Sequence, residues 1–408
     1  MPDTTTGQAG PEPTTTEQRR AGLPQLILLL AGSCMSVLGA VLIAPVLPQM
    51  SRDFAGTPGA EVLVPIVLTV PALVIGLTAP FAGFIADAVD RKRLLIVAML
   101  AYSVVGTAPL YLNSLTSILG SRVLLGICEA AIMTSCTTLI GDYWSGRQRA
   151  RYLGLQTLVA AISATVFLGA GGILGTAGWR TPFWLYLAAV VIVVPMARML
   201  WQPARPASDP TAGLEPIPWR QLAAPVGVTV FGGIVFYALL VQLSFVLNDV
   251  GVASTAMIGG ITAIMSLATA IGAGLFGKVA HRGPRVLLPA EFTLSGLGLL
   301  LVFATTSVPV ITLGAILTGF GTGLMLPTLL TWAVNSLTFT QRGRGTGLWT
   351  GTLFLGQFVS PLVIAALAAG VGGLQPALAV LGIAAGVMAV VTLVALRGRN
   401  IPLDVTHD

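Results

Sequence analysis

The sequence predicts an all-α membrane protein whose twelve transmembrane helices form two pseudo-symmetric six-helix bundles. The mean hydropathy is +0.90 over 408 residues. Apolar runs of about 18 residues or more, each long enough to cross a bilayer, recur from Leu26 to Leu396. A charged turn from Gly83 to Arg93 recurs in degenerate form from Gly277 to Arg285. Such a repeat indicates two similar bundles joined in one chain, an architecture typical of transporters.

The composition excludes several kinds of site. Only 9% of the residues are charged, and the 48 Gly and 26 Pro are normal for membrane helices, where small residues permit close packing. Cys34, Cys128 and Cys136 fall in apolar runs and are expected to be buried thiols, while His281 and His407 lie in a loop and a tail. The sequence therefore predicts no disulfide framework, no metal site and no cofactor.

The apolar runs give the expected order of the elements. The twelve predicted spans are 24–50, 61–88, 92–112, 115–143, 149–176, 180–200, 219–247, 254–281, 284–304, 306–335, 342–370 and 373–397. The Thr- and Pro-rich N-terminus is predicted to be a disordered tail. The expected organisation is a cytoplasmic tail at 1–23, an N-terminal bundle at 24–200, a Pro-rich cytoplasmic linker at 201–218, a C-terminal bundle at 219–397 and a cytoplasmic tail at 398–408.

The placement of Lys and Arg predicts that both termini are cytoplasmic. With the N-terminus inside, 18 of the 21 basic residues fall on the cytoplasmic side, as the positive-inside rule requires. Arg52 and Arg180 fall outside, and Arg122 lies within a span. The net charge of +6 therefore reflects topology in the cell membrane, and no nucleic-acid partner is predicted.

The two halves also align beyond the charged turn. The segment from Asp142 to Gly154 matches the segment from Asn335 to Gly347 at an offset of 193 residues, and the same offset places Gly126 on Gly319. An internal duplication of a six-helix unit explains this match.

The first charged turn resembles the loop between helices 2 and 3 of the major facilitator superfamily, and the resemblance covers essentially the whole chain. The family pattern is Gly, three residues, Asp, a basic residue, any residue, Gly, Arg, and Arg or Lys. Gly83, Asp87, Arg91 and Lys92 match it. Asp90 replaces the second Gly, and we expect it to adopt the unusual backbone conformation that Gly would supply.

The resemblance implies that Gly83, Asp87, Arg91 and Asp142 form an interdomain latch. In the family, the loop Asp faces the start of helix 11, and the Arg pairs with an acid at the end of helix 4, where this chain has Asp142. An Asp at a helix N-terminus meets the positive end of the helix dipole, so the contact would hold the halves together in the outward-open state. The alternative is a solvated positive-inside loop, which does not explain Asp87.

Predicted helix 4 carries two charges, Arg122 and Glu129, seven residues apart on one helix face. The Arg122-x-x-x-Gly126 pattern resembles proton-coupled members of the superfamily, and Glu129-Ala130 resembles organic-anion and Spinster-like lipid transporters. A charge at mid-membrane costs about 3 kcal/mol or more unless it is paired or faces water. Two interpretations follow: a proton-coupling or substrate site, or a structural pair that fixes the helix in its bundle.

Together these features predict a monomeric, proton-coupled secondary transporter that exports a small-molecule substrate, an organic compound, by alternating access. The alternatives are a proton-linked symporter that imports an organic anion held by Arg122, and a transporter of a lipid-like substrate. Predicted helix 5 departs from the drug–proton antiporter motif, because Phe167 and Leu168 stand where that motif has Gly-Pro.

Other polar groups within the spans are few. Some of four polar or amphipathic residues are expected to line the cavity: Tyr237, Gln242, Trp332 and Gln357. An intramembrane enzyme would need convergent catalytic groups, and no acid pair or Ser–His set is evident in the spans, so no enzyme is predicted.

Overall fold

The computed structural model describes residues 21–81, 89–203, 216–338 and 341–398, and all regular elements within these ranges are helices. The predicted tails at 1–23 and 398–408 and the predicted linker at 201–218 lie mostly outside the described residues. Twelve helices in the described part are long and apolar enough to cross a membrane. The predicted fold class is therefore confirmed, and the observed spans begin and end within a few residues of the predicted ones except where α3 meets residues that are not described.

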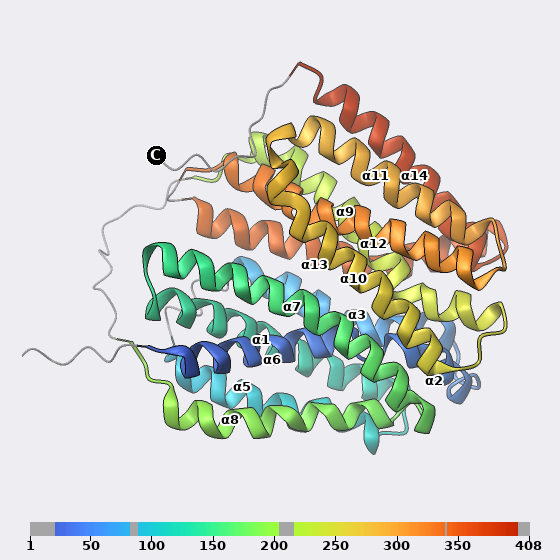
Figure 1. The fold of residues 1–408 in the computed structure, drawn as a ribbon. Helices are drawn as coiled ribbons and strands as arrows, with labels where there is room; N and C mark the ends of the chain where they lie inside the picture. The colour runs from blue at the N-terminus through green and yellow to red at the C-terminus, as the bar shows by residue number, and fades with distance from the viewer. Residues whose placement is uncertain (1–20, 82–88, 204–215, 339–340, 399–408) are drawn as a thin grey trace, which may run out of the picture.

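The helices form two groups that follow one another along the chain (Figure 1). The N-terminal bundle contains α1 (Leu23–Val41), α2 (Leu47–Asp53), α3 (Ala60–Thr78), α5 (Arg91–Gly106), α6 (Leu115–Tyr143), α7 (Gly146–Leu174) and α8 (Ala188–Met199). The C-terminal bundle contains α9 (Trp219–Asp249), α10 (Thr255–Val279), α11 (Pro284–Phe303), α12 (Val308–Asn335), α13 (Arg342–Val371) and α14 (Leu374–Ala395).

Short 3-10 helices extend or interrupt several spans. The first span is broken after Val41, where α1 gives way to η1 and α2, because Pro45 and Pro48 cannot donate backbone hydrogen bonds. The sixth span begins with a 3-10 helix that leads into α8. The 3-10 helices are η1 (Ala44–Val46), η2 (Ala79–Phe81), η3 (Ala108–Leu110), η4 (Gly175–Ala177), η5 (Thr181–Leu187) and η6 (Ala280–Arg282).

The two ends of the molecule differ in charge. The basic end is the one where α5 begins and α6 ends, and it carries Arg91, Lys92, Arg93, Arg147 and Arg149. The start of α1 lies at this end, on the left of Figure 1, and α14 runs toward the same end and finishes at the top of the picture. The other end, where α2 and α9 finish, is called the opposite end below.

Two helix pairs supply the most extensive contacts between the bundles, α7 with α10 and α3 with α13. Glycines allow the backbones to approach closely in both pairs. A methyl group added at Gly259 of α10 would lie 2.6 Å from the Cα atom of Gly172 in α7. In the other pair, a methyl group added at Gly351 of α13 would lie 2.7 Å from the carbonyl oxygen of Gly76 in α3. The α7–α10 contact lies toward the opposite end and the α3–α13 contact toward the basic end.

Candidate functional site

Glu129 lies at the middle of α6 and is fully enclosed, with a side-chain exposure of 0%. Neither carboxyl oxygen has a hydrogen-bond partner among the described residues. The carboxyl lies directly against Gly39 of α1, because a methyl group at Gly39 would be 2.8 Å from Glu129 Cδ and would overlap Glu129 Oε1. The carboxyl group therefore occupies a space that only the absence of a side chain at position 39 provides.

Arg122, two turns earlier on α6, is 1% exposed and is held by neutral groups. Its Nη1 donates to the Tyr186 hydroxyl at 3.2 Å, and its Nη2 donates to the carbonyl oxygens of Gly106 at 3.2 Å and Val105 at 3.4 Å. The guanidinium carbon lies 5.3 Å from the ring centre of Phe183 and 5.5 Å from that of Tyr186, within the range of cation–π attraction. Arg122 thus ties α6 to the end of α5 and to η5.

Arg122 and Glu129 do not contact each other through a salt bridge in the described part of the chain, although both lie on α6. Seven helical residues correspond to about 10.5 Å along the axis, and the Arg122 side chain reaches groups on α5 and η5 instead. The sequence therefore placed both charges on one helix but could not give their partners.

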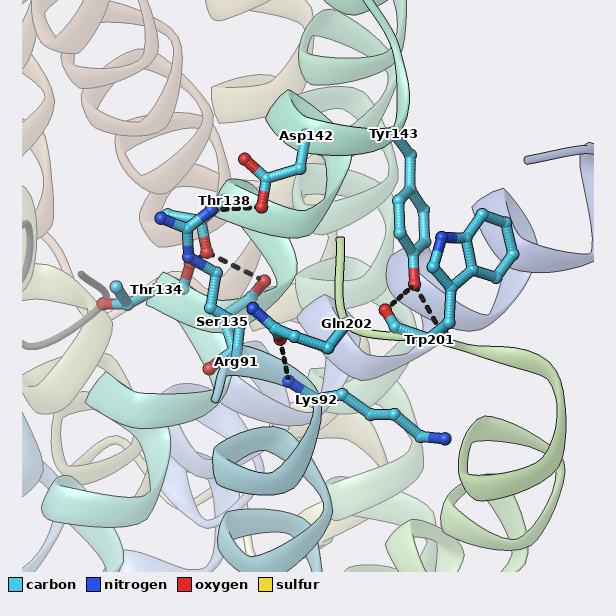
Figure 2. A network of polar contacts seen from close by, with 9 residues as sticks. All are labelled: Arg91, Lys92, Thr134, Ser135, Thr138, Asp142, Tyr143, Trp201 and Gln202. Carbon is cyan, nitrogen blue, oxygen red and sulfur yellow. Dashed lines mark hydrogen bonds and ion pairs between the residues drawn. The ribbon is translucent and has the colours of Figure 1, made fainter. Parts of the chain in front are cut away.

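The latch residues are only partly described. Gly83 and Asp87 lie outside the described residues. Arg91, at the start of α5, forms an ion pair with Asp142, near the end of α6 (Figure 2). Their side chains come together because α5 and α6 pack against each other.

Asp90 corrects one expectation about this turn. Its backbone, with φ −64° and ψ 109°, is ordinary extended chain, so it does not take a conformation that favours Gly. Asp90 instead caps α5, because its carboxylate accepts a hydrogen bond from the backbone N–H of Arg93 at 2.9 Å. A negative cap also offsets the cost of three basic residues in the first turn of the helix.

A second set of contacts lies beside this ion pair, as Figure 2 shows. The Tyr143 hydroxyl donates to the carbonyl oxygen of Trp201 at 2.6 Å and accepts from its backbone N–H at 2.9 Å. The side chain of Gln202 accepts from the backbone N–H of Lys92 at 3.3 Å. The end of α6, the start of α5 and the segment after α8 are thus joined at the basic end.

The segment before the latch lies against the other bundle. A methyl group added at Gly347, in the second turn of α13, would be 2.8 Å from the carbonyl oxygen of Ala79 and 3.3 Å from the Cα atom of Pro80. Ala79 and Pro80 belong to η2, which immediately precedes residues 82–88. This contact brings the chain that leads into the latch next to the start of α13.

The residues proposed to line the cavity are all buried: Tyr237, Gln242, Trp332 and Gln357. Tyr237 of α9 makes a contact that sequence analysis missed, because its hydroxyl donates to the carbonyl oxygen of Ala40 in α1 at 2.7 Å. The structure thus gives Tyr237 a partner in the other bundle.

Two further polar features occur in the described part of the chain. The C-terminal bundle also encloses a carboxyl group, since Glu291 of α11 is 1% exposed and its Oε1 accepts from the Thr328 hydroxyl at 2.6 Å. At the opposite end, a cleft of about 530 Å³ is lined in part by Arg52, Asp53 and Arg180, with Arg180 Nη1 3.8 Å from the carboxylate of Asp53.

The sequence also matches a known family. The profile of the Major Facilitator Superfamily matches residues 29–251 and 226–406, which together cover most of the chain. The chain belongs to the major facilitator superfamily. It is therefore a transporter and not an enzyme, as predicted.

Similar proteins of this family include drug-resistance proteins. The class C tetracycline resistance protein of Escherichia coli is 29% identical over 171 residues, which is 41% of each chain. The quinolone resistance protein NorA of Staphylococcus aureus is 25% identical over 211 residues, 50% of this chain and 54% of that protein. The matches therefore span about half the length of these relatives.

Solved structures of similar fold cover more of the chain. A bacterial homologue of the human lysosomal transporter Spinster, in an inward-facing and occupied conformation, has a TM-score of 0.75 at 15% identity and covers 92% of this chain and 98% of its own. The human organic anion transporter MFSD10 has a TM-score of 0.67 at 18% identity, with 91% and 99% covered. At this identity the likeness shows the fold alone.

Proposed function

We propose that this chain is a proton-coupled secondary transporter that exports small organic compounds by alternating access. The observation that carries the proposal is the buried carboxyl of Glu129 at the middle of α6, which has no hydrogen-bond partner among the described residues. An ionised carboxylate without a partner is costly in such surroundings. The group is therefore suited to hold a proton while enclosed and to release it to water when a vestibule opens.

Among the described residues Glu291 is also an enclosed carboxyl, but only one of its two oxygens is without a hydrogen-bond partner. Glu291 accepts a hydrogen bond from Thr328 within its own bundle. It lies on α11, whose main helix contacts are with α12 and α14 of the same bundle. Glu129 by contrast lies against α1, which contacts α7 and the C-terminal bundle through Ala40. These contacts support Glu129 over Glu291 as the proposed proton-coupling carboxyl.

Export is favoured over import by two considerations. The relatives of similar sequence are named as resistance proteins for tetracycline and for quinolones. In addition, Arg122 is poorly placed to hold an organic anion, because all three nitrogens of its guanidinium donate to groups inside the N-terminal bundle. These points support a drug-like organic compound as the substrate and leave an imported anion or a lipid-like compound as alternatives.

The orientation follows from charge. The basic end should face the cytoplasm, which places both termini of this cell-membrane protein inside. The latch of Gly83, Asp87, Arg91 and Asp142 would then lie on the cytoplasmic side. The ion pair of Arg91 with Asp142 and the approach of η2 to α13 support this proposal. Asp87 would meet the N-terminus of α13 and hold the bundles together while the opposite end is open.

The test is transport in proteoliposomes with an imposed pH gradient. Glu129→Gln keeps the size and polarity of the side chain but removes its titratable group. We expect it to abolish gradient-driven transport of a resistance-type compound such as a quinolone while substrate exchange without a gradient continues. Glu291→Gln is the matched control, since it changes the other enclosed carboxyl, and it should remain gradient-driven.

Two results would count against the proposal. Gradient-driven transport at the normal rate by the Glu129→Gln protein would remove Glu129 from the coupling step. Counterflow of organic anions but of no neutral or cationic drug-like compound would favour the importer instead.

A further inference from the structure

One short segment of α1, Gly39 and Ala40, is held between side chains from the two bundles. The carboxyl of Glu129, from α6 of the N-terminal bundle, lies against Gly39. The hydroxyl of Tyr237, from α9 of the C-terminal bundle, donates to the carbonyl oxygen of Ala40 at 2.7 Å. Glu129, Gly39 and Tyr237 are all buried. Two consecutive residues therefore connect the enclosed carboxyl to a contact between the bundles.

The contact between Gly39 and the Glu129 carboxyl is tightly packed. A methyl group there would overlap Glu129 Oε1 and would lie 3.5 Å from the Tyr102 hydroxyl. Tyr102 in turn donates to the carbonyl oxygen of Met35, one turn earlier on α1. The carboxyl thus packs directly against the backbone of α1. Because packed interiors leave little free volume, a hydrated carboxylate, which needs more room than the neutral carboxyl, would displace this backbone.

The Ala40 side depends on where α1 ends. Its last residue is Val41, and the final four carbonyl groups of a helix lack the full set of partners inside the helix. Ala40 is in this last turn, so its carbonyl oxygen is available to a donor from another element. The Tyr237 hydroxyl is that donor, and the bond crosses from one bundle to the other.

The surroundings of Glu129 do not compensate a negative charge on its carboxyl group. The described residues offer no hydrogen-bond partner for its oxygens. Arg122 has its donors directed to α5 and η5. The ionisable groups around the carboxyl are Arg122 and Cys128 of α6, Tyr102 of α5, Tyr186 of η5 and Tyr237 of α9.

We propose that Tyr237 is a positioning residue that transmits the protonation state of Glu129 to the contact between the bundles, through Gly39 and Ala40. With the proton bound, the neutral carboxyl fits against Gly39 and the bond from Tyr237 to Ala40 keeps α1 and α9 together. When the proton leaves for water, the carboxylate becomes hydrated and needs more room. Gly39 and Ala40 then shift, the bond is lost, and α9 is free to part from α1.

This inference rests on the proposed coupling role of Glu129, and the experiment separates the two. Spin labels are placed at the opposite end on exposed positions of each bundle, through Ala55→Cys after α2 and Ala253→Cys before α10. The native cysteines are replaced in this background. The distance distribution between the labels is measured by pulsed electron paramagnetic resonance in lipid nanodiscs, across a range of pH.

The parent protein should change from shorter to longer distances as pH rises, and Glu129→Gln should stay at the shorter ones. Tyr237→Phe removes only the hydroxyl, and it should raise the long-distance population by about fivefold to tenfold at low pH, the equivalent of one buried hydrogen bond, and flatten the pH response. Ser360→Ala is the matched control. It removes a hydroxyl that donates to the carbonyl oxygen of Ile234 in α9 at 2.9 Å, a bond that stays inside the C-terminal bundle, so its pH response should match the parent.

The outcomes are distinguishable. If Glu129→Gln responds to pH as the parent does, the coupling role of Glu129 and this inference are both overturned. If Glu129→Gln is insensitive to pH while Tyr237→Phe behaves as the parent, the coupling role stands and the path through Tyr237 is overturned. If Ser360→Ala loses the response as Tyr237→Phe does, the effect belongs to the general stability of α9, and the specific path is overturned.

Discussion

At the scale of single residues, Arg122 is a cation enclosed by neutral groups. Its acceptors are two backbone carbonyls and a Tyr hydroxyl, with two aromatic rings beside it. Its position could be predicted, because charges are rare in the spans. Its partners could not, since every residue has a carbonyl group and nothing in the sequence marks those of Val105 and Gly106. The same holds for Gly39 and Glu129, whose contact depends on how α1 packs against α6.

Replacement of Arg122 should destabilise the protein. Arg122→Lys keeps the charge but loses the planar fork that reaches several acceptors at once, so we expect a loss of roughly 2–3 kcal/mol. The apparent melting temperature of the purified protein measures this loss. Arg147→Lys, at an exposed position of α7, is the control and should melt as the parent does. Equal melting of both variants would show that the contacts of Arg122 do little for stability.

The ion pair of Arg91 and Asp142 gives a second prediction at this scale. Asp142→Arg should slow transport by roughly an order of magnitude, because it places two like charges together at the latch. Exchanging the charges, with Arg91→Asp added, should recover at least part of the rate, which is measured in proteoliposomes at equal protein density. A double variant that is no faster than Asp142→Arg would argue against a role for this pair.

At the scale of elements, the sequence predicted the spans well because each span is a long apolar run. It did not predict the break of the first span at η1 or the 3-10 start of the sixth, since hydropathy continues through both. It also did not predict which helices touch across the bundles. The contact of α7 with α10 depends on Gly172 and Gly259 facing each other, and glycines are too common here to indicate a particular pair.

A large side chain should disrupt the α7–α10 contact at Gly259 but not at the neighbouring Gly260. Gly259→Leu places a side chain where the backbone of α7 lies, since a methyl group alone would be 2.6 Å from Gly172 Cα. We expect it to hold the opposite end apart and to reduce transport by at least about tenfold. Gly260→Leu is the matched control, because nothing lies within 4 Å of a methyl group added there. Similar transport by both variants would contradict this role of the contact.

At the scale of the whole molecule, the duplication sets the fold but not the chemistry. The offset of 193 residues that places Gly126 on Gly319 also places Glu129 on Thr322. The enclosed carboxyl of the C-terminal bundle is on α11 instead, at Glu291. The fold could therefore be predicted from the repeat, whereas the candidate proton site required the position of one residue that the repeat does not share.

The orientation of the whole molecule can be tested by labelling. Gln148→Cys lies at the basic end, near the start of α7, and Ala55→Cys lies at the opposite end, and both positions are exposed. Each variant is made in a protein whose native cysteines are replaced. In intact cells a membrane-impermeant maleimide should label Ala55→Cys and not Gln148→Cys, and inverted vesicles should give the reverse. Labelling of Gln148→Cys from outside would overturn the topology.

The glycine contacts between the bundles have a thermodynamic consequence. Closing a contact usually freezes side chains, and each long side chain that is immobilised costs up to about 2 kcal/mol of entropy, whereas Gly costs none. At Gly172 with Gly259 and at Gly76 with Gly351, backbone meets backbone. Joining or parting the bundles at these points therefore changes little side-chain entropy. Side-chain entropy at these two contacts should therefore contribute little to the temperature dependence of any parting of the bundles.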